Sequence, residues 1–165
     1  MCSGDSGIYG MASLLYEMTE VHPEVEIKVV AGITAACSGS AVLGAPLSHD
    51  FAVISLSDRL TPYELIMKRL RHAAEADLSI AIYNPGGKSR SDYLQKACDV
   101  LLESLPTDRI CGYVKNIGRK GEESHILTLG ELRDTKVDMF TTVFIGNSST
   151  RMINGKMVTP RGYRK

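Results

Sequence analysis

The sequence predicts an α/β protein, and three observations lead to this fold class. Short apolar runs that are typical of strands alternate with longer segments of helical periodicity. Hydrophobic residues make up 44% of the 165 residues, which is enough for an ordinary core. The chain opens on a glycine-rich loop, Ser3–Gly7, and only Met1 and Cys2 stand where a strand would normally lead into such a loop. We therefore expect the later part of a larger protein.

The first part of the chain predicts a helix, a strand and a second helix. Residues 8–19 have helical spacing, and Asp5 or Ser6 is the expected cap. Residues 25–30 (VEIKVV) predict a strand, and residues 34–43 predict a helix of small residues that ends at Gly44. These elements are too few for a domain, so residues 1–48 are assigned to the end of an N-terminal α/β domain and residues 49–165 to a C-terminal α/β domain.

The second part predicts five strands and two long helices. The helix that starts at Thr61-Pro62-Tyr63-Glu64 has a capping-box pattern with proline at its first position, and its apolar residues continue to Ala74. Ser91 is the expected cap of the next helix, which Pro106 ends. The predicted strands cover residues 51–56, 78–83, 110–114, 125–129 and 139–145.

Composition excludes several classes of function. The 19 basic and 19 acidic residues balance, so the whole chain carries no signal for nucleic acid or for a membrane. The four cysteines form no C-x-x-C pair and the four histidines are scattered, so we expect no metal site and reduced thiols in a cytoplasmic protein. No acidic residue follows Asp138, and the basic tail that remains is either solvated or attracts an anionic substrate.

Four small loops follow predicted strands or open the chain, at residues 3–7, 31–35, 83–86 and 116–119. Because ligand sites in α/β sheets lie at the carboxyl ends of strands, we expect these loops to converge on one pocket. Asp5 is suited to a cationic or hydroxyl-bearing ligand, and Thr34 and Asn84 offer neutral hydrogen bonds. The alternative for each loop is a tight turn or a helix cap.

The loops contain no pair of catalytic acids or bases and no nucleophile motif. A reaction driven by positioning fits such a site, and methyl transfer from a sulfonium donor is one example. Tyr9, Tyr83 and Tyr93 are candidates for contact with a flat or cationic ligand, or for core packing. Basic residues beside the loops are either solvated or pair with substrate carboxylates.

Several segments together resemble one known family. Residues 3–12 (SGDSGIYGMA), 30–36 (VAGITAA), 83–85 (YNP), 114–116 (VKN) and 137–142 (VDMFTT) are similar to segments of the tetrapyrrole (precorrin) methylases. Thr150-Arg151 and residues 157–163 (MVTPRGY) resemble most closely the members that act on carbon 17 of precorrin-3B. The resemblance extends over nearly the whole chain.

This resemblance implies an S-adenosylmethionine-dependent enzyme with two α/β domains, the C-terminal one built on a mixed sheet. The implied reaction is methylation of precorrin-3B at ring carbon 17, with ring contraction, in cobalamin (vitamin B12) biosynthesis. A homodimer with a tetrapyrrole substrate is also implied. The implied donor-binding residues are Gly4, Asp5, Ser6, Ile8, Tyr9, Thr34, Ala35, Tyr83, Asn84 and Asn116. The expected substrate-binding residues are Lys88, Arg90, Arg119 and Arg151.

The sequence departs from the family pattern in two places. Ser6 stands where the family usually has proline. The family's first strand and its glycine-proline-glycine loop are absent, so we expect this piece to bind donor weakly and not to turn over. The alternatives are a precorrin methylase with another target carbon and a non-catalytic module that binds an anionic ligand. A nucleic-acid binder is disfavoured because Tyr163 is the one aromatic residue in the basic tail.

Overall fold

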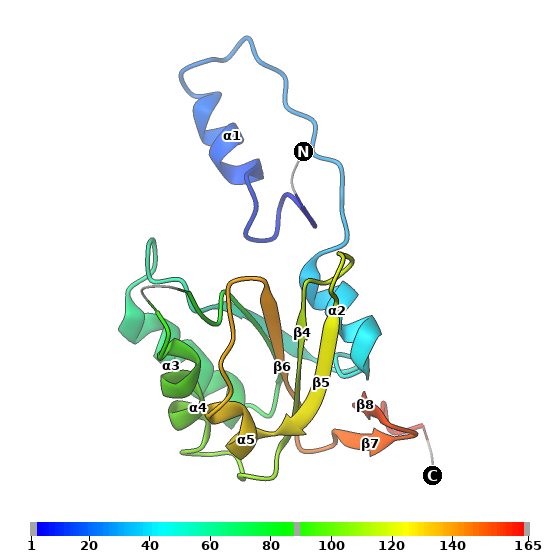
Figure 1. Ribbon diagram of the computed structural model, residues 1–165. Coiled ribbons are helices and arrows are strands. Elements are labelled where there is room, and N and C mark those ends of the chain that lie inside the picture. Colours follow the sequence, from blue (N-terminus) through cyan, green and yellow to red (C-terminus); the bar gives the residue numbers. More distant parts are fainter. Residues whose placement is uncertain (1–2, 88–89, 164–165) are drawn as a thin grey trace.

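A computed structural model of the protein describes residues 3–87 and 90–163 and shows an arm that stands off an α/β body (Figure 1). The arm comprises residues 3–34 and contains one helix, α1 (Ala12–Met18). The body is built on a five-stranded sheet with strand order β2-β3-β6-β4-β5. Its strands are β2 (Phe51–Ser55), β3 (Ser79–Tyr83), β4 (Ile110–Lys115), β5 (Glu123–Thr128) and β6 (Thr141–Ile145).

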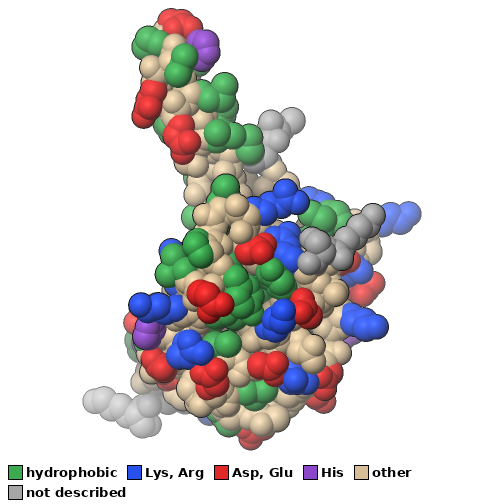
Figure 2. Space-filling model, turned by 90° about the vertical axis from the view of Figure 1, so that its left-hand side faces the viewer, with side chains coloured by type: hydrophobic (Ala, Val, Ile, Leu, Met, Phe, Trp, Pro, Cys, Tyr) green, Lys and Arg blue, Asp and Glu red, His purple; other side chains and the backbone are tan. Residues whose placement is uncertain are grey.

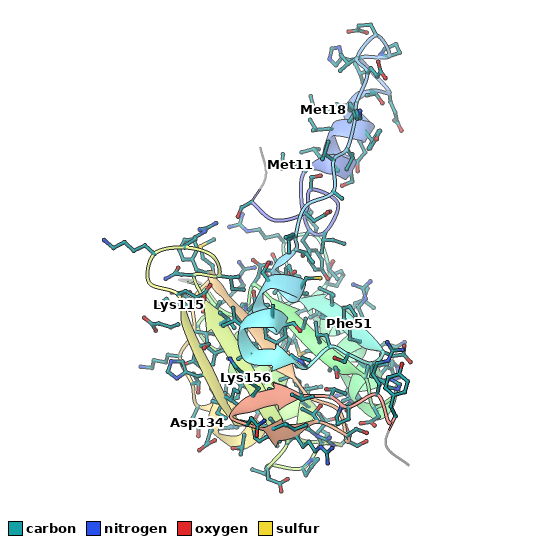
Figure 3. The ribbon with its side chains drawn as sticks, turned by 90° about the vertical axis from the view of Figure 1, so that its right-hand side faces the viewer. Met11, Met18, Phe51, Lys115, Asp134 and Lys156 are labelled. Carbon is teal, nitrogen blue, oxygen red and sulfur yellow. The ribbon has the colours of Figure 1, made fainter. Side chains whose placement is uncertain are left out.

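The sheet is mixed, as the family resemblance implied. Strands β2 and β3 are parallel, and β6 runs antiparallel to both of its neighbours, β3 and β4. Strands β2, β3 and β4 therefore point in one direction, and their carboxyl ends share an edge of the sheet with the amino end of β6. Lys115, at the end of β4, lies on the side of the arm, and Asp134 lies at the opposite end of the body (Figure 3).

Three helices cover one face of the sheet, namely α3 (Tyr63–Glu75), α4 (Tyr93–Leu101) and α5 (Leu129–Arg133). Helices α3 and α4 show the predicted apolar stripes, and Leu70 of α3 and Leu101 of α4 are fully buried. They pack with Ile80 and Ile82 of β3 and with Ile145 of β6 in the main core. This core accounts for the stability of the layer, because buried aliphatic side chains contribute most of the hydrophobic free energy.

Helix α2 (Ala35–Leu43) covers the other face of the sheet. Leu43 is buried against Ala81, Val114 and Phe144. A Cβ atom on Gly39 would lie 2.7 Å from the Phe144 ring, so the small residues of this helix allow its close approach to the sheet. Because α2 packs on the sheet, the body begins at residue 35; the domain boundary after residue 48 stays a prediction.

A second, three-stranded sheet follows α2 and uses the end of the chain. Its order is β1-β8-β7, with β1 (Gly44–Ala45) parallel to β8 (Lys156–Val158) and β7 (Arg151–Ile153) antiparallel to β8. The turn between β7 and β8 is Asn154-Gly155, and both residues have positive φ, as two-residue hairpins require. Of the tail's basic residues that the structure describes, Arg151 and Lys156 lie in this hairpin and Arg161 follows it.

Four local predictions are wrong. Residues 25–30 form no strand, because no described segment lies beside them to accept and donate ladder hydrogen bonds. Helix α1 starts at Ala12 and not at residue 8, because Tyr9 takes a positive φ. Its N-cap residue is Met11, so neither Asp5, whose carboxylate bonds elsewhere, nor Ser6 caps it. Helix α3 begins at Tyr63 after Pro62, without the predicted side-chain cap from Thr61. Helix α4 begins at Tyr93 with Asp92 as its N-cap residue, so the predicted cap from Ser91 is absent. Among the described residues, no helix is both long and apolar enough for a membrane span.

Candidate functional site

The four predicted loops meet at the sheet edge that faces the arm. A cavity of about 270 Å³ is lined by residues of all four, including Asp5, Thr34, Asn84 and Ile117. The loops after β3 and β4 meet because those strands point in the same direction. The loops at residues 3–7 and 31–35 arrive from the arm, which doubles back above this edge (Figure 1). The prediction that the loops converge is confirmed.

Asp5 joins the two loops of the arm. Its Oδ1 accepts a hydrogen bond from the Gly7 N–H, and its Oδ2 accepts one from the Gly32 N–H, each at 2.7 Å. These bonds, that from Gly32 above all, hold the pKa of the Asp5 carboxyl below its usual value, because they favour the charged form. Glycine is required at position 32, since a Cβ atom there would lie 2.2 Å from the Gly4 carbonyl oxygen.

Tyr83, the last residue of β3, connects the sheet to the start of α2. Its phenol oxygen is hydrogen-bonded to Thr34 Oγ1 and accepts the Ala36 N–H at 2.6 Å. Thr34 is the N-cap residue of α2, so the Tyr83 phenol accepts one of the backbone N–H groups that have no partner within the first turn of the helix. Tyr83 therefore fixes the position of the second loop over the sheet.

Tyr9 ties the arm to the end of β2. Its hydroxyl donates to the Val53 carbonyl and accepts the Ser55 N–H, both at 3.1 Å. Its ring lies 5.4 Å from that of Tyr83, measured between centroids. Asn84 Nδ2 donates to Ser55 Oγ at 2.9 Å, so the third loop is linked to the same strand end.

The fourth loop lines an adjoining cavity of about 190 Å³, which also contains Tyr83 and Asn84. Asn84 and Asn116 both have φ of 53°, a conformation that asparagine tolerates better than most residues and that turns the chain sharply after each strand. Arg119 donates to Ser3 Oγ at 3.1 Å, which connects this loop to the first. The Arg119 guanidinium also lies over the Phe140 ring, at 5.8 Å.

Most of the expected donor-binding residues are brought together here, but not all of them. Ser6 lines neither cavity, and its carbonyl accepts the Ala12 N–H at the start of α1. The other nine line the 270 Å³ cavity or, for Asn116, the 190 Å³ cavity. Their role in binding stays a prediction.

The four expected substrate-binding residues do not form one group. Arg119 is at the cavities, whereas Arg151 lies on β7 and lines a different hollow beside the terminal hairpin. Arg90 donates to Ser57 Oγ at 2.9 Å and lies 3.5 Å from Asp58, so its charge is partly neutralised within the chain. Lys88 lies outside the described residues.

Some lining residues were not among the expected site residues. Ser38 of α2 and Thr141 and Thr142 of β6 face the cavities. The two threonines belong to the VDMFTT segment that carries part of the family resemblance, and this resemblance could have indicated them as site residues. Ser38 follows Thr34 by one helical turn, and no motif in the sequence indicated it as a site residue.

The cavities offer hydroxyl groups, amides and backbone groups, with apolar walls from Ile8, Ile33 and Ile117. The one carboxylate in their lining, Asp5, is bonded to backbone N–H groups. Across residues 3–87 and 90–163, no three metal-ligating side chains of the His, Cys, Asp or Glu types cluster. This arrangement suits the binding and orientation of a polar small molecule, and it suits reactions that need alignment more than proton transfer.

Comparison with known proteins gives a methylase family and relatives that are named methyltransferases. The family described as Tetrapyrrole (Corrin/Porphyrin) Methylases matches residues 1–133. The chain is 52% identical to a probable cobalt-factor III C(17)-methyltransferase of Methanocaldococcus jannaschii, covering 98% of this chain and 68% of that protein. It is 40% identical to a precorrin-3B C(17)-methyltransferase of a Sinorhizobium species, covering 97% and 66%.

Solved structures show the same fold. The crystal structure of the methyltransferase CobJ superposes with a TM-score of 0.88 at 39% identity, covering 96% of this chain and 68% of that one. The uroporphyrin-III C-methyltransferase of Thermus thermophilus, complexed with S-adenosylhomocysteine, superposes with a TM-score of 0.66 at 19% identity, covering 87% and 62%. The second likeness concerns the fold alone.

Proposed function

Because this chain belongs to the tetrapyrrole methylases, we propose that it transfers a methyl group from S-adenosylmethionine to ring carbon 17 of a cobalamin-pathway tetrapyrrole. The observation that carries the proposal is the convergence of the four loops on one cavity. The sequence identities of 52% and 40% to relatives named C(17)-methyltransferases support carbon 17 over other target carbons. The family assignment disfavours a non-catalytic anion-binding module.

We place the donor against the loops around Asp5, Thr34, Tyr83 and Asn84. The hydroxyl and amide groups there match the polar groups of a nucleoside, and the apolar walls match its base. The protein's contribution to the reaction is then orientation of donor and acceptor, since methyl transfer from a sulfonium needs no strong base. Aligned reactants alone account for roughly 7–11 kcal/mol of a barrier.

Calorimetry with S-adenosylhomocysteine tests the donor site. We expect binding to this chain, and we expect Thr34→Trp to abolish it because the indole would fill the cavity beside Tyr83. Lys136→Gln, an exposed change on the body, is the matched control. Unchanged affinity in Thr34→Trp would refute the site, provided that its circular dichroism spectrum matches the parent.

The target carbon needs a separate experiment. A longer chain that carries the family's first strand and glycine-proline-glycine loop is needed for turnover. Its incubation with methyl-¹³C-labelled donor and either precorrin-3B or cobalt-factor III, followed by NMR of the product, is expected to place the label on carbon 17. The two acceptors differ in cobalt, and the relatives carry both names. A label on another ring carbon would favour the alternative of a different precorrin methylase.

We also propose a cytoplasmic homodimer. Large apolar side chains of the arm are exposed, including Leu15 and Val21, and a second copy of the chain would cover such a surface. Light scattering of the purified protein distinguishes a dimer from a monomer, and Leu15→Glu is expected to shift the balance towards the monomer.

A further inference from the structure

A third and larger cavity, of about 970 Å³, adjoins the donor site. It lies between the arm, at Tyr9 to Ser13, and the segment from the end of β2 to the start of α3. Tyr9 and Asn84 line both this cavity and the 270 Å³ cavity, so the two spaces meet at these side chains. A molecule in the larger cavity would therefore lie next to one in the smaller.

The larger cavity is positively charged. Arg59, in the loop after β2, and Arg69, on α3, both line it, and no aspartate or glutamate does. Within residues 3–87 and 90–163, neither arginine takes part in an ion pair, whereas Arg71 is bonded to Glu103 and Arg133 to Asp99. Figure 2 shows some basic side chains directly below the neck of the arm, on a face of the body that also carries acidic ones.

The remaining lining also suits an anionic ligand. Ser13, Ser55, Ser57 and Thr61 add hydroxyl groups, and Leu60 adds an apolar side chain that is 98% exposed. Guanidinium groups bind carboxylates through paired hydrogen bonds, so two of them in one cavity suit a ligand that carries more than one carboxylate. The volume is several times that of the donor cavity.

We infer that Arg59 and Arg69 bind carboxylate side chains of the tetrapyrrole acceptor and thereby fix which edge of the macrocycle faces the donor across Tyr9 and Asn84. The inference rests on the proposed function, and it assigns the acceptor to residues other than Arg90 and Arg151. Arg90 is already engaged by Ser57 and Asp58, and Arg151 is on the terminal hairpin. Both assigned side chains are exposed, so their replacement leaves the core intact.

Fluorescence titration with uroporphyrin III, a tetrapyrrole polycarboxylate, tests the inference on the chain as it stands. We expect Arg59→Gln/Arg69→Gln to weaken uroporphyrin binding at least tenfold and Arg59→Lys/Arg69→Lys to restore part of it. The matched control is Lys68→Gln/Lys136→Gln, which removes two charges from exposed positions outside the cavity and is expected to change affinity less than twofold. Affinity for S-adenosylhomocysteine is expected to be equal in all variants.

Three results would overturn the inference: no uroporphyrin binding by the parent, an affinity within twofold of the parent in the Arg59→Gln/Arg69→Gln variant, or an equal loss in the lysine control. If any of these results occurs while S-adenosylhomocysteine binding is intact, the proposed donor site is not refuted. Loss of nucleoside binding in the parent itself refutes the proposed function instead.

Discussion

The arm and the body place the same types of apolar residue in opposite environments. In the body, Leu70 and Ile82 are fully buried, whereas in the arm Val21 and Val30 are 77% and 74% exposed. Figure 2 shows the arm's apolar side chains on its surface. The arm nevertheless supplies two of the four loops of the site, and the described side-chain contacts that hold it run through Ser3, Tyr9 and Thr34 at the site itself. The core thus lies within the body, whereas the candidate site lies where the arm meets the body.

The largest expected effect compares one leucine from each region. Leu70→Ala should lower the free energy of unfolding by about 2–5 kcal/mol, because it leaves a cavity between α3 and the sheet. Leu15→Ala in the arm, where the side chain is 45% exposed, should lower it by about 0.5 kcal/mol or less. Urea denaturation followed by circular dichroism measures both. Equal losses would mean that the arm folds as part of the core.

A substitution in the arm should separate binding from stability. Gly32→Ala places a methyl group against the Gly4 carbonyl and forces the two arm loops apart. We expect S-adenosylhomocysteine affinity to fall by roughly tenfold or more, since misplaced groups lose alignment, with little change in the melting temperature of the body. Gly87→Ala is the control, because a Cβ atom there meets nothing within 4 Å. A large fall in melting temperature in Gly32→Ala would argue against separate regions.

The Asp5 carboxylate predicts a smaller, pH-linked effect. The pKa of Asp5 is lowered in the folded chain. Its contribution to the stability of the folded state is therefore present above its ordinary pKa and is lost as the pH falls through the lowered value. Donor binding should therefore not respond to Asp5 between pH 8 and about pH 5. Asp5→Asn should weaken binding at pH 7 by roughly three- to tenfold, because one charge-assisted bond is lost. Asp108→Asn, exposed on the body, should have no effect.

The smallest effect concerns thiol reactivity. Burial raises the pKa of the Cys98 thiol to about 12 and raises that of Cys111 as well, whereas Cys37 on α2 is exposed. In titration with a disulfide reagent, Cys37→Ser should remove one fast-reacting thiol and leave the unfolding curve nearly unchanged. Cys98 and Cys111 should react only when the body unfolds. Fast reaction of either would show that the body opens locally.

The same contrast explains what the sequence could predict. The helices of the body were predictable because buried residues such as Leu70 and Leu101 recur at helical spacing. The loops after β3 and β4 were predictable because asparagine and glycine follow apolar strands there. The segment at residues 25–30 has strand composition but no partner, and pairing is not a local property.

Two further elements carried signals that were not used. Helix α5 has a true capping box between Thr128 and Glu131, but its five residues are too few to show periodicity. The hairpin of β7 and β8 is centred on Asn154-Gly155, a strong hairpin signal between two very short strands. The larger cavity with Arg59 and Arg69 was not predictable, because it depends on how the arm is placed against the loop after β2.

The order of strands in the sheet has a consequence for synthesis on the ribosome. Strand β6 is the last of the five in the chain, yet it lies between β3 and β4 and pairs with both. Until residue 145 has emerged, the nascent chain holds two separate strand pairs with open edges, which are sites for aggregation. The sheet therefore closes only after its last strand has been made, and a stop codon before β6 would leave a product without its central strand.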